Sequence, residues 1–122
     1  MHIVLDATAM VAVSRGNPLA THLIHRAHTE PGWHLYATTC ALIEADRQHP
    51  GTAEHLAALP GITLLALDLP AALALAADTT WAHAHTRDAA APTPQRPDGA
   101  LVATADPYRW KGEPVRVITL TP

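Results

Sequence analysis

The sequence predicts an α/β protein with three layers, an α/β/α sandwich built on a mostly parallel central sheet. The first observation behind this prediction is that short apolar runs, typical of buried strands, alternate with longer segments that have helical spacing. The second is that glycine and proline interrupt the chain between these segments. Such alternation favours parallel strands joined by helical crossovers. The expected strands are residues 3–5, 33–37, 62–67, 100–104 and 115–120.

Cap and breaker residues place the helices between these strands. Asp6 ends the first apolar run and precedes a helix. Asn17 and Pro18 open a second helix, because asparagine caps helices and proline suits their first turn. The Pro-rich segment 91–99 is neither helix nor strand, and we expect an ordered connector or a mobile flap there. The expected helices are residues 7–14, 18–29, 40–48, 52–59, 68–78 and 81–90, with a short helix or turn from residue 106.

Composition limits the functions open to this chain. Its 122 residues predict a single domain over residues 1–122, and a net charge of −3 disfavours a nonspecific binder of duplex DNA. The single cysteine, Cys40, excludes an internal disulfide, and its apolar neighbours favour a buried structural thiol. No signal peptide is recognisable and no apolar stretch approaches the length of a membrane span. We therefore expect a cytoplasmic protein with no membrane partner.

Three acidic residues stand in comparable places along the chain. Asp6 follows the first expected strand, Asp106 follows the strand at 100–104, and Glu44 lies in the helix after the second strand. In a parallel sheet the first two would project from the same edge, and clustered carboxylates repel one another unless a cation joins them. Oxygen ligands suit a hard ion such as Mg²⁺ or Mn²⁺. Asp6 as a simple helix cap, Asp106 as a turn residue and Glu44 on a solvated helix face are the alternatives.

The sequence resembles a PIN domain, the fold of VapC-like toxin ribonucleases. The resemblance rests on Val-Leu-Asp-Ala-Thr-Ala at residues 4–9, Ala-Leu-Ile-Glu-Ala at 41–45 and Val-Ala-Thr-Ala-Asp-Pro at 102–107, with element order similar over nearly the whole chain. It implies Asp6, Glu44 and Asp106 as catalytic metal ligands and Mg²⁺ or Mn²⁺ as the cofactor. It also implies single-stranded RNA as the substrate, an antitoxin protein as a partner, and a homodimer. The expected activity is that of a metal-dependent endoribonuclease.

One position departs from the family's pattern. The family's further acid is expected on the helix at 81–90, where His83 stands instead. A neutral imidazole can bind a divalent ion but adds no charge, and it suits Mn²⁺ better than Mg²⁺. Asp78 or Asp88 would compensate for it, and a second alignment makes Asp98 the missing acid but leaves no strand before the last motif. The alternative function is therefore a non-catalytic PIN-like module that acts through protein contacts.

Basic and histidine side chains supply the remaining candidates. Arg15, Arg87 and Arg109 are candidate contacts for RNA phosphates, the alternative being ordinary surface arginines. The nine histidines show no spacing that supplies the four ligands of a zinc site, and we expect most of them at the surface. A phosphatase with an Asp nucleophile is disfavoured, because the residues after Asp6 lack the second carboxylate of an Asp-x-Asp pair.

Overall fold

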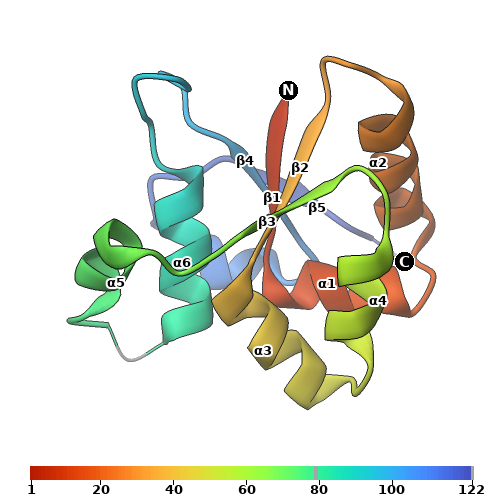
Figure 1. Cartoon of the computed structure of the whole chain (residues 1–122), viewed down its shortest axis with the longest axis horizontal. Helices are drawn as coiled ribbons and strands as arrows, with labels where there is room; N and C mark the ends of the chain where they lie inside the picture. The colour runs from red at the N-terminus through yellow and green to blue at the C-terminus, as the bar shows by residue number, and fades with distance from the viewer. Residues whose placement is uncertain (79, 122) are drawn as a thin grey trace.

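The computed structural model describes residues 1–78 and 80–121, and in this part of the chain it confirms the three-layer α/β/α sandwich (Figure 1). A five-stranded sheet has the order β3-β2-β1-β4-β5 among the described residues, and all its strand pairs are parallel. The strands are β1 (His2–Leu5), β2 (His34–Thr38), β3 (Ile62–Leu65), β4 (Leu101–Thr104) and β5 (Val117–Thr119).

Helices cover both faces of this sheet (Figure 1). Figure 1 shows α1, α2 and α4 on one side, α5 and α6 on the other, and α3 crossing near the carboxyl ends of the strands. Their bounds are α1 (Ala7–Ser14), α2 (Pro18–Thr29), α3 (Thr39–Gln48), α4 (Thr52–Ala58), α5 (Leu69–Leu75) and α6 (Trp81–Ala90), and the 3₁₀ helix η1 spans Pro107–Trp110. No helix in the described ranges is long and apolar enough to span a bilayer.

Side-chain alternation along β1 divides the core between the two faces. Ile3 and Leu5 belong to the larger apolar cluster, which includes Met10 of α1 and Leu56 of α4. Val4 points the other way and packs in a smaller cluster with residues of α6 and η1. Since all of these side chains are almost fully buried, β1 is enclosed on both faces, as expected for the central strand of a parallel sheet.

The register of β1 determines which residues meet at the carboxyl edge of the sheet. Leu5 pairs with Ala37 of β2 and with Ala103 of β4, and the backbone N–H of Asp6 donates to the carbonyl of Ala103 at 3.1 Å. The next residues of the two neighbouring strands are Thr38 and Thr104. Asp6 therefore leaves the sheet between two threonines, at the edge where ligands bind in open α/β sheets.

Some predicted elements are shorter in the structure. The strand predicted at 62–67 ends at Leu65, because its partner strand ends at Thr38, the residue paired with Leu65. The last strand covers only Val117–Thr119, opposite residues 102–104 of β4. The helix predicted at 68–78 is limited to Leu69–Leu75.

The Pro-rich segment 91–99 is an ordered connector. Thr93 and Arg96 exchange backbone hydrogen bonds of 3.0 Å, and the N–H of Ala100 donates to the carbonyl of Ala90 at 2.9 Å. Gly99 has φ +70°, and a Cβ built there would lie 2.4 Å from the Ala90 carbonyl oxygen. A side chain at position 99 would therefore force the loop away from the end of α6.

Candidate functional site

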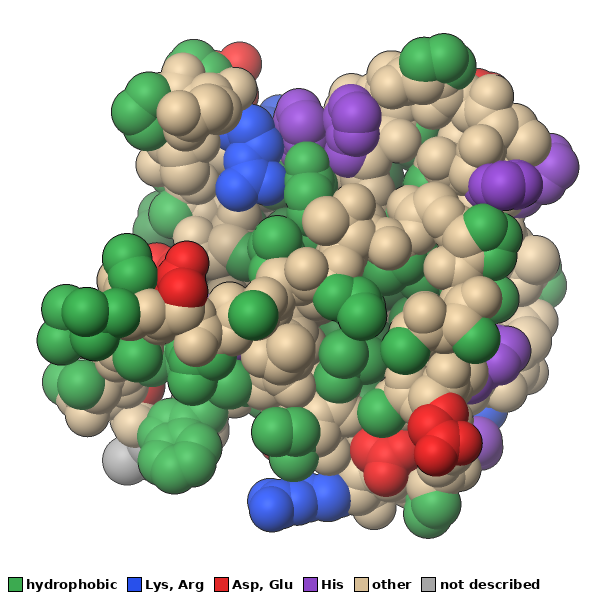
Figure 2. All heavy atoms as spheres, viewed as in Figure 1, with side chains coloured by type: hydrophobic (Ala, Val, Ile, Leu, Met, Phe, Trp, Pro, Cys, Tyr) green, Lys and Arg blue, Asp and Glu red, His purple; other side chains and the backbone are tan. Residues whose placement is uncertain are grey.

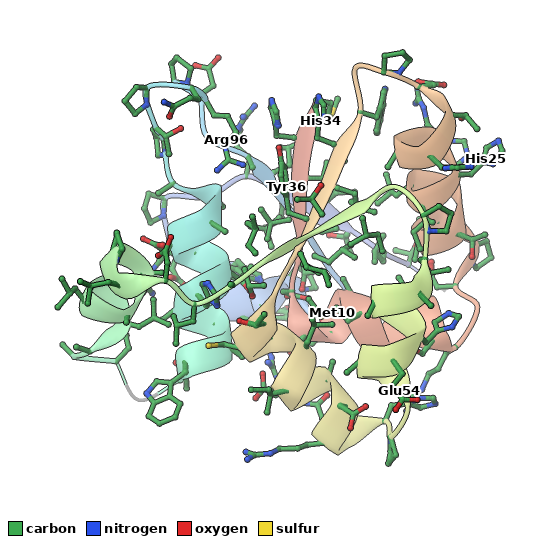
Figure 3. All side chains as sticks on the ribbon, viewed as in Figure 1. Met10, His25, His34, Tyr36, Glu54 and Arg96 are labelled. Atoms are coloured by element: carbon green, nitrogen blue, oxygen red, sulfur yellow. The ribbon has the colours of Figure 1, made fainter. Side chains whose placement is uncertain are left out.

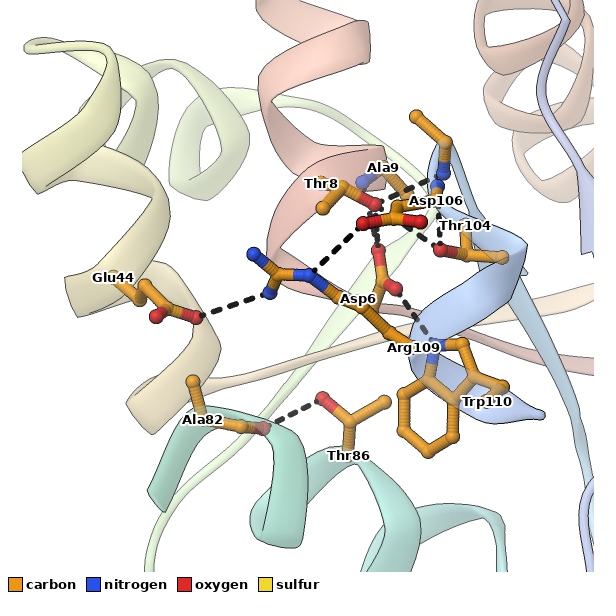
Figure 4. A network of polar contacts seen from close by, with 11 residues as sticks. Asp6, Thr8, Ala9, Glu44, Ala82, Thr86, Thr104, Asp106, Arg109 and Trp110 are labelled. Carbon is orange, nitrogen blue, oxygen red and sulfur yellow. Dashed lines mark hydrogen bonds and ion pairs between the residues drawn. The ribbon is translucent and has the colours of Figure 1, made fainter. Parts of the chain in front are cut away.

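Asp6 is a buried carboxylate that accepts three hydrogen bonds (Figure 4). Its Oδ1 accepts from the Ala9 N–H at 2.8 Å and from the Thr8 hydroxyl at 2.7 Å, while Oδ2 accepts from the indole N–H of Trp110 at 2.9 Å. Asp6 is therefore the N-cap of α1, as one of the alternative interpretations predicted, and it is also fastened to η1. Only 4% of its surface is exposed.

Two threonines connect this carboxylate to the end of β4. The Thr8 hydroxyl that donates to Asp6 also accepts from the Ala105 N–H at 2.9 Å and lies 3.1 Å from the Thr104 hydroxyl. The Thr104 hydroxyl accepts from the backbone N–H of Asp106 at 3.0 Å. The network fixes the start of α1 relative to the loop that carries Asp106, so the two aspartates lie at the same edge of the sheet (Figure 4).

Arg109 lies between the other two acidic side chains (Figure 4). Its Nε is 3.3 Å from Asp106 Oδ2, and its Nη1 is 4.0 Å from Glu44 Oε2. All three side chains are 40–45% exposed, so water screens these ion pairs and each contributes little to stability. Below, the acidic edge means Asp6, Glu44 and Asp106.

The acidic edge fits a hard divalent cation in donor chemistry but is closed to one in this arrangement. Its oxygens are the donors that Mg²⁺ and Mn²⁺ prefer, and a cationic group, Arg109, already occupies the space beside two of the acids. Within the described residues, no three His, Cys, Asp or Glu side chains are grouped so that they could hold a metal together. Because the Arg109 side chain is 40% exposed, it has room to turn toward solvent and leave Asp106 and Glu44 free.

His83 is connected to the acidic edge through Trp110. Its ring stacks on the indole at a centroid separation of 3.9 Å, and its Nε2 contacts the carboxylate of Glu113. The indole N–H of the same tryptophan donates to Asp6. The structure thus places His83 on the far side of the Trp110 ring and pairs it with an acid that sequence reasoning did not identify.

The candidate arginines lie in three different settings. Arg15 lines a cavity of about 610 Å³ that is also bounded by Thr8 and Asp106, so it is the candidate closest to an open site. Arg109 is paired with the acidic edge. Arg87 donates to Glu113 at 2.7 Å and to Asp78 at 3.0 Å.

The ion pairs of Arg87 affect its pKa and its availability for binding RNA phosphate. Its hydrogen bond to Glu113 is the main cause that raises the pKa of Arg87. Burial alone would raise the pKa of Glu113, but hydrogen bonds from Arg87 and His83 lower it below its usual value. Both groups are therefore charged at neutral pH, and a phosphate at Arg87 would compete with the two acids that already pair with its guanidinium.

Several residues of the site were not found from the sequence. Trp110 is 3% exposed and binds a residue 104 positions away, and no local pattern indicates such a contact. Thr8 and Thr104 lie inside the quoted motifs, but their hydroxyl network follows only from the strand register. Thr38 is fully buried at the same edge, and its hydroxyl has no hydrogen-bond partner among the described residues. Cys40 is only half-buried rather than buried as predicted, and burial raises the pKa of its thiol.

His85 is a buried histidine that makes the stability depend on pH. It is 2% exposed, whereas most of the histidines are exposed as expected, and its Nδ1 lies 3.5 Å from the Cys40 backbone nitrogen. Burial lowers the pKa of His85, and the charges of Asp88 and Asp68 offset this only in part. The unfolded chain therefore binds a proton near pH 6.5, where the folded chain does not.

We expect the free energy of unfolding to fall as the pH drops below about 6.5, by at most about 1.4 kcal/mol per pH unit for this one proton. Above pH 6.5 the contribution of His85 to the free energy of unfolding does not change with pH. Urea unfolding of wild type and His85→Gln at pH 7.0 and about 5.5 checks this, with a smaller pH effect expected in the variant. The pKa of His2 is also lowered, chiefly by burial, so His2→Gln serves as the comparison for the remaining slope. A wild type that gains stability on acidification contradicts the prediction.

No family model matches this chain, and a search of curated proteins finds no similar sequence. The geometry of the site and the motifs of the sequence are therefore what indicate a function.

Proposed function

We propose that this protein is a metal-dependent endoribonuclease of the toxin–antitoxin type, which hydrolyses phosphodiester bonds in single-stranded RNA at the acidic edge. The observation that carries the proposal is that two aspartates from distant parts of the chain lie at the same carboxyl edge of a parallel sheet, with Glu44 on the other side of Arg109. Asp6 and Asp106 are joined there by the Thr8–Thr104 network, and Glu44 faces Asp106 across Arg109. The resemblance to PIN domains points to the same three residues.

The roles of the residues follow from their exposure. Asp6, Glu44 and Asp106 would hold Mg²⁺ or Mn²⁺, which when bound supplies a Lewis acid and an activated water. Asp6 is the rigid member, since three donors fix its carboxylate, whereas Asp106 and Glu44 are half-exposed and free to adjust. Arg109, once turned away from the two acids, would reach an RNA phosphate, and Arg15 would contact the chain from the adjoining cavity. A cytoplasmic location, an antitoxin and a homodimer belong to the same proposal.

A non-catalytic interaction module is the second candidate, and a specific observation favours it. The two groups that close the acidic edge, Arg109 and Trp110, belong to the chain itself. They satisfy the acids without any added ion, and His83 stands where the family has an acid. If Arg109 and Trp110 keep the acidic edge closed to metal ions, the protein has the fold of a ribonuclease without RNA-cleaving activity.

RNA cleavage with controlled metal content separates the two candidates. Purified protein is incubated with a long single-stranded RNA in Mn²⁺, in Mg²⁺ or in EDTA, and the products are sized on a denaturing gel. We expect internal cleavage with Mn²⁺, weaker cleavage with Mg²⁺, and none in EDTA. Calorimetric titration with Mn²⁺ alone is the independent readout. Absence of both Mn²⁺ binding and cleavage overturns the proposal in favour of the interaction module.

Removing the guanidinium should open the site. In Arg109→Gln, the positive charge beside Asp106 and Glu44 is lost, so Mn²⁺ no longer competes with it. We expect Mn²⁺ to bind the variant about tenfold more tightly than wild type, the change that about 1.4 kcal/mol of relieved competition produces. Calorimetry at low salt measures it, with Arg26→Gln as the matched control, because Arg26 also pairs with a carboxylate, that of Glu30 at the end of α2. Unchanged Mn²⁺ affinity would show that Arg109 does not occupy the ion's place.

A further inference from the structure

A stack of three rings lies at the opposite, amino edge of the sheet. His2 of β1 and His34 of β2 are register partners, and their rings stack at a centroid distance of 4.8 Å and an interplanar angle of 14°. The Tyr36 ring stacks on His2 at 5.8 Å, and its hydroxyl lies 2.8 Å from His2 Nδ1. His34 is exposed, so the outer part of this stack is open to solvent.

The Pro-rich connector brings a cation to this stack (Figure 3). The Arg96 guanidinium lies 5.0 Å from the centre of the Tyr36 ring. Figure 3 shows Arg96 reaching from the connector toward Tyr36, on the side of the sheet where His34 lies. The backbone of Arg96 is fixed by hydrogen bonds of 3.0 Å from its N–H to the carbonyl and the hydroxyl of Thr93. Below, the amino-edge cluster means His2, His34, Tyr36 and Arg96.

The amino-edge cluster has no acid paired with it among the residues that the structure describes. None of the ion pairs formed by the described residues includes His2, His34 or Arg96. Burial lowers the pKa of His2 first, and the neighbouring positive groups that lower it further are His34, the chain's amino group and Arg96. The charged neighbours that lower the pKa of His2 are thus all positive, and an anion stabilises such an environment.

The surface around this cluster is hollowed. Figure 2 shows a notch in the molecule between the Pro-rich connector and the segment that joins α2 to β2, with arginine and histidine side chains along its walls. A site of this kind offers a phosphate the cationic guanidinium of Arg96 beside histidine N–H groups, and it offers a flat base the face of an exposed ring.

We propose that the amino-edge cluster binds a nucleotide, with the phosphate held by Arg96 and the histidines and the base stacked on His34. This site is separate from the acidic edge, because it lies at the other ends of β1 and β2. Its ligand is identified by a phosphate next to a flat base, which either a free mononucleotide or the end of an RNA chain provides. The Pro-rich connector has a function in this view, which is to hold Arg96 over the sheet.

Titration of the purified protein with defined probes tests the proposal. The probes are inorganic phosphate, adenosine 5′-monophosphate, adenosine, and a short RNA carrying a 5′-phosphate, and the readouts are calorimetry and amide shifts in two-dimensional NMR spectra. We expect the mononucleotide to bind more tightly than phosphate or adenosine, with shifts at residues of β1, β2 and the connector. A similar affinity for the mononucleotide and the RNA indicates a free nucleotide as the ligand. A much tighter RNA whose amide shifts fall on the same residues indicates an RNA end, whereas shifts at the acidic edge report the other site.

Variants distinguish this site from a general attraction of anions. Arg96→Gln and His34→Ala each change a solvent-accessible side chain and are expected to weaken mononucleotide binding by about tenfold. Arg47→Gln removes an equal charge at a distant surface and should leave binding unchanged. Asp106→Asn should also leave it unchanged, so the result does not depend on the proposed ribonuclease activity. The proposal is overturned if no probe binds at about 10 mM, or if Arg47→Gln weakens binding as much as Arg96→Gln.

Discussion

Replacing Asp106 by asparagine is expected to lower the rate of RNA cleavage by about 100-fold or more, since a metal-holding carboxylate contributes several kcal/mol to the transition state. The fold should not be affected. The Asp106 side chain is 45% exposed, and its ion-pair partner in the structure is Arg109 at 3.3 Å. Glu44→Gln should behave in the same way, because Glu44 is 40% exposed and lies 4.0 Å from the same guanidinium.

This prediction is measured as cleavage rate at saturating Mn²⁺ beside the melting temperature of each variant. Glu54→Gln is the matched control, because Glu54 is an exposed carboxylate in the first turn of α4 (Figure 3) and is not one of the three acids of the acidic edge. It should keep both activity and stability. If Asp106→Asn cleaves RNA as fast as Glu54→Gln does, the activity resides elsewhere or in a contaminant, and the proposed ribonuclease loses its site.

Local pattern predicts the elements of this fold well. The buried strands are short, uninterrupted apolar runs, and the caps Asn17 and Asp6 do accept the backbone N–H groups that open α2 and α1. The meeting of Asp6 and Asp106 was also predictable, because parallel strands end at a common edge. Element ends were less certain, as at Leu65, because a strand stops where its neighbour stops.

The environment of the acids could not be predicted in the same way. Which cation lies beside Asp106 and Glu44 depends on the rotamer of Arg109, and which donor reaches Asp6 depends on how η1 packs. Trp110 is the clearest case. Its apolar ring suits the core position that it occupies, but a buried indole N–H needs an acceptor, and the tertiary fold decides that this acceptor is Asp6.

Asp6 and Asp68 both cap helices, and comparing them measures what the buried contacts of Asp6 contribute. Asp68 accepts one backbone hydrogen bond, from Ala71 at 2.9 Å, and is exposed. Asparagine caps helices as well as aspartate does, so Asp68→Asn should change the free energy of unfolding by less than about 0.5 kcal/mol. In Asp6→Asn, the new amide NH₂ must face a donor, either the Trp110 indole or the pair formed by Thr8 and Ala9. We expect a loss of about 2–4 kcal/mol, from a buried donor left unpaired and a charge-assisted bond removed.

The comparison is made by urea unfolding of four variants. They are Asp6→Asn, Asp68→Asn, Trp110→Phe and the double variant that combines Asp6→Asn with Trp110→Phe. The phenyl ring removes the donor that opposes the new NH₂, so the double variant should lose less stability than the sum of the two single losses. Trp81→Phe is the control for the ring change, since Trp81 is 67% exposed. Equal losses for Asp6→Asn and Asp68→Asn would mean that Asp6 acts only as a cap. A larger loss of stability for Asp6→Asn would have a practical consequence, because inactivity of that variant could then result from unfolding as well as from loss of the metal ligand. The half-exposed Asp106 and Glu44 are therefore the sites at which the reaction can be tested without a change in stability.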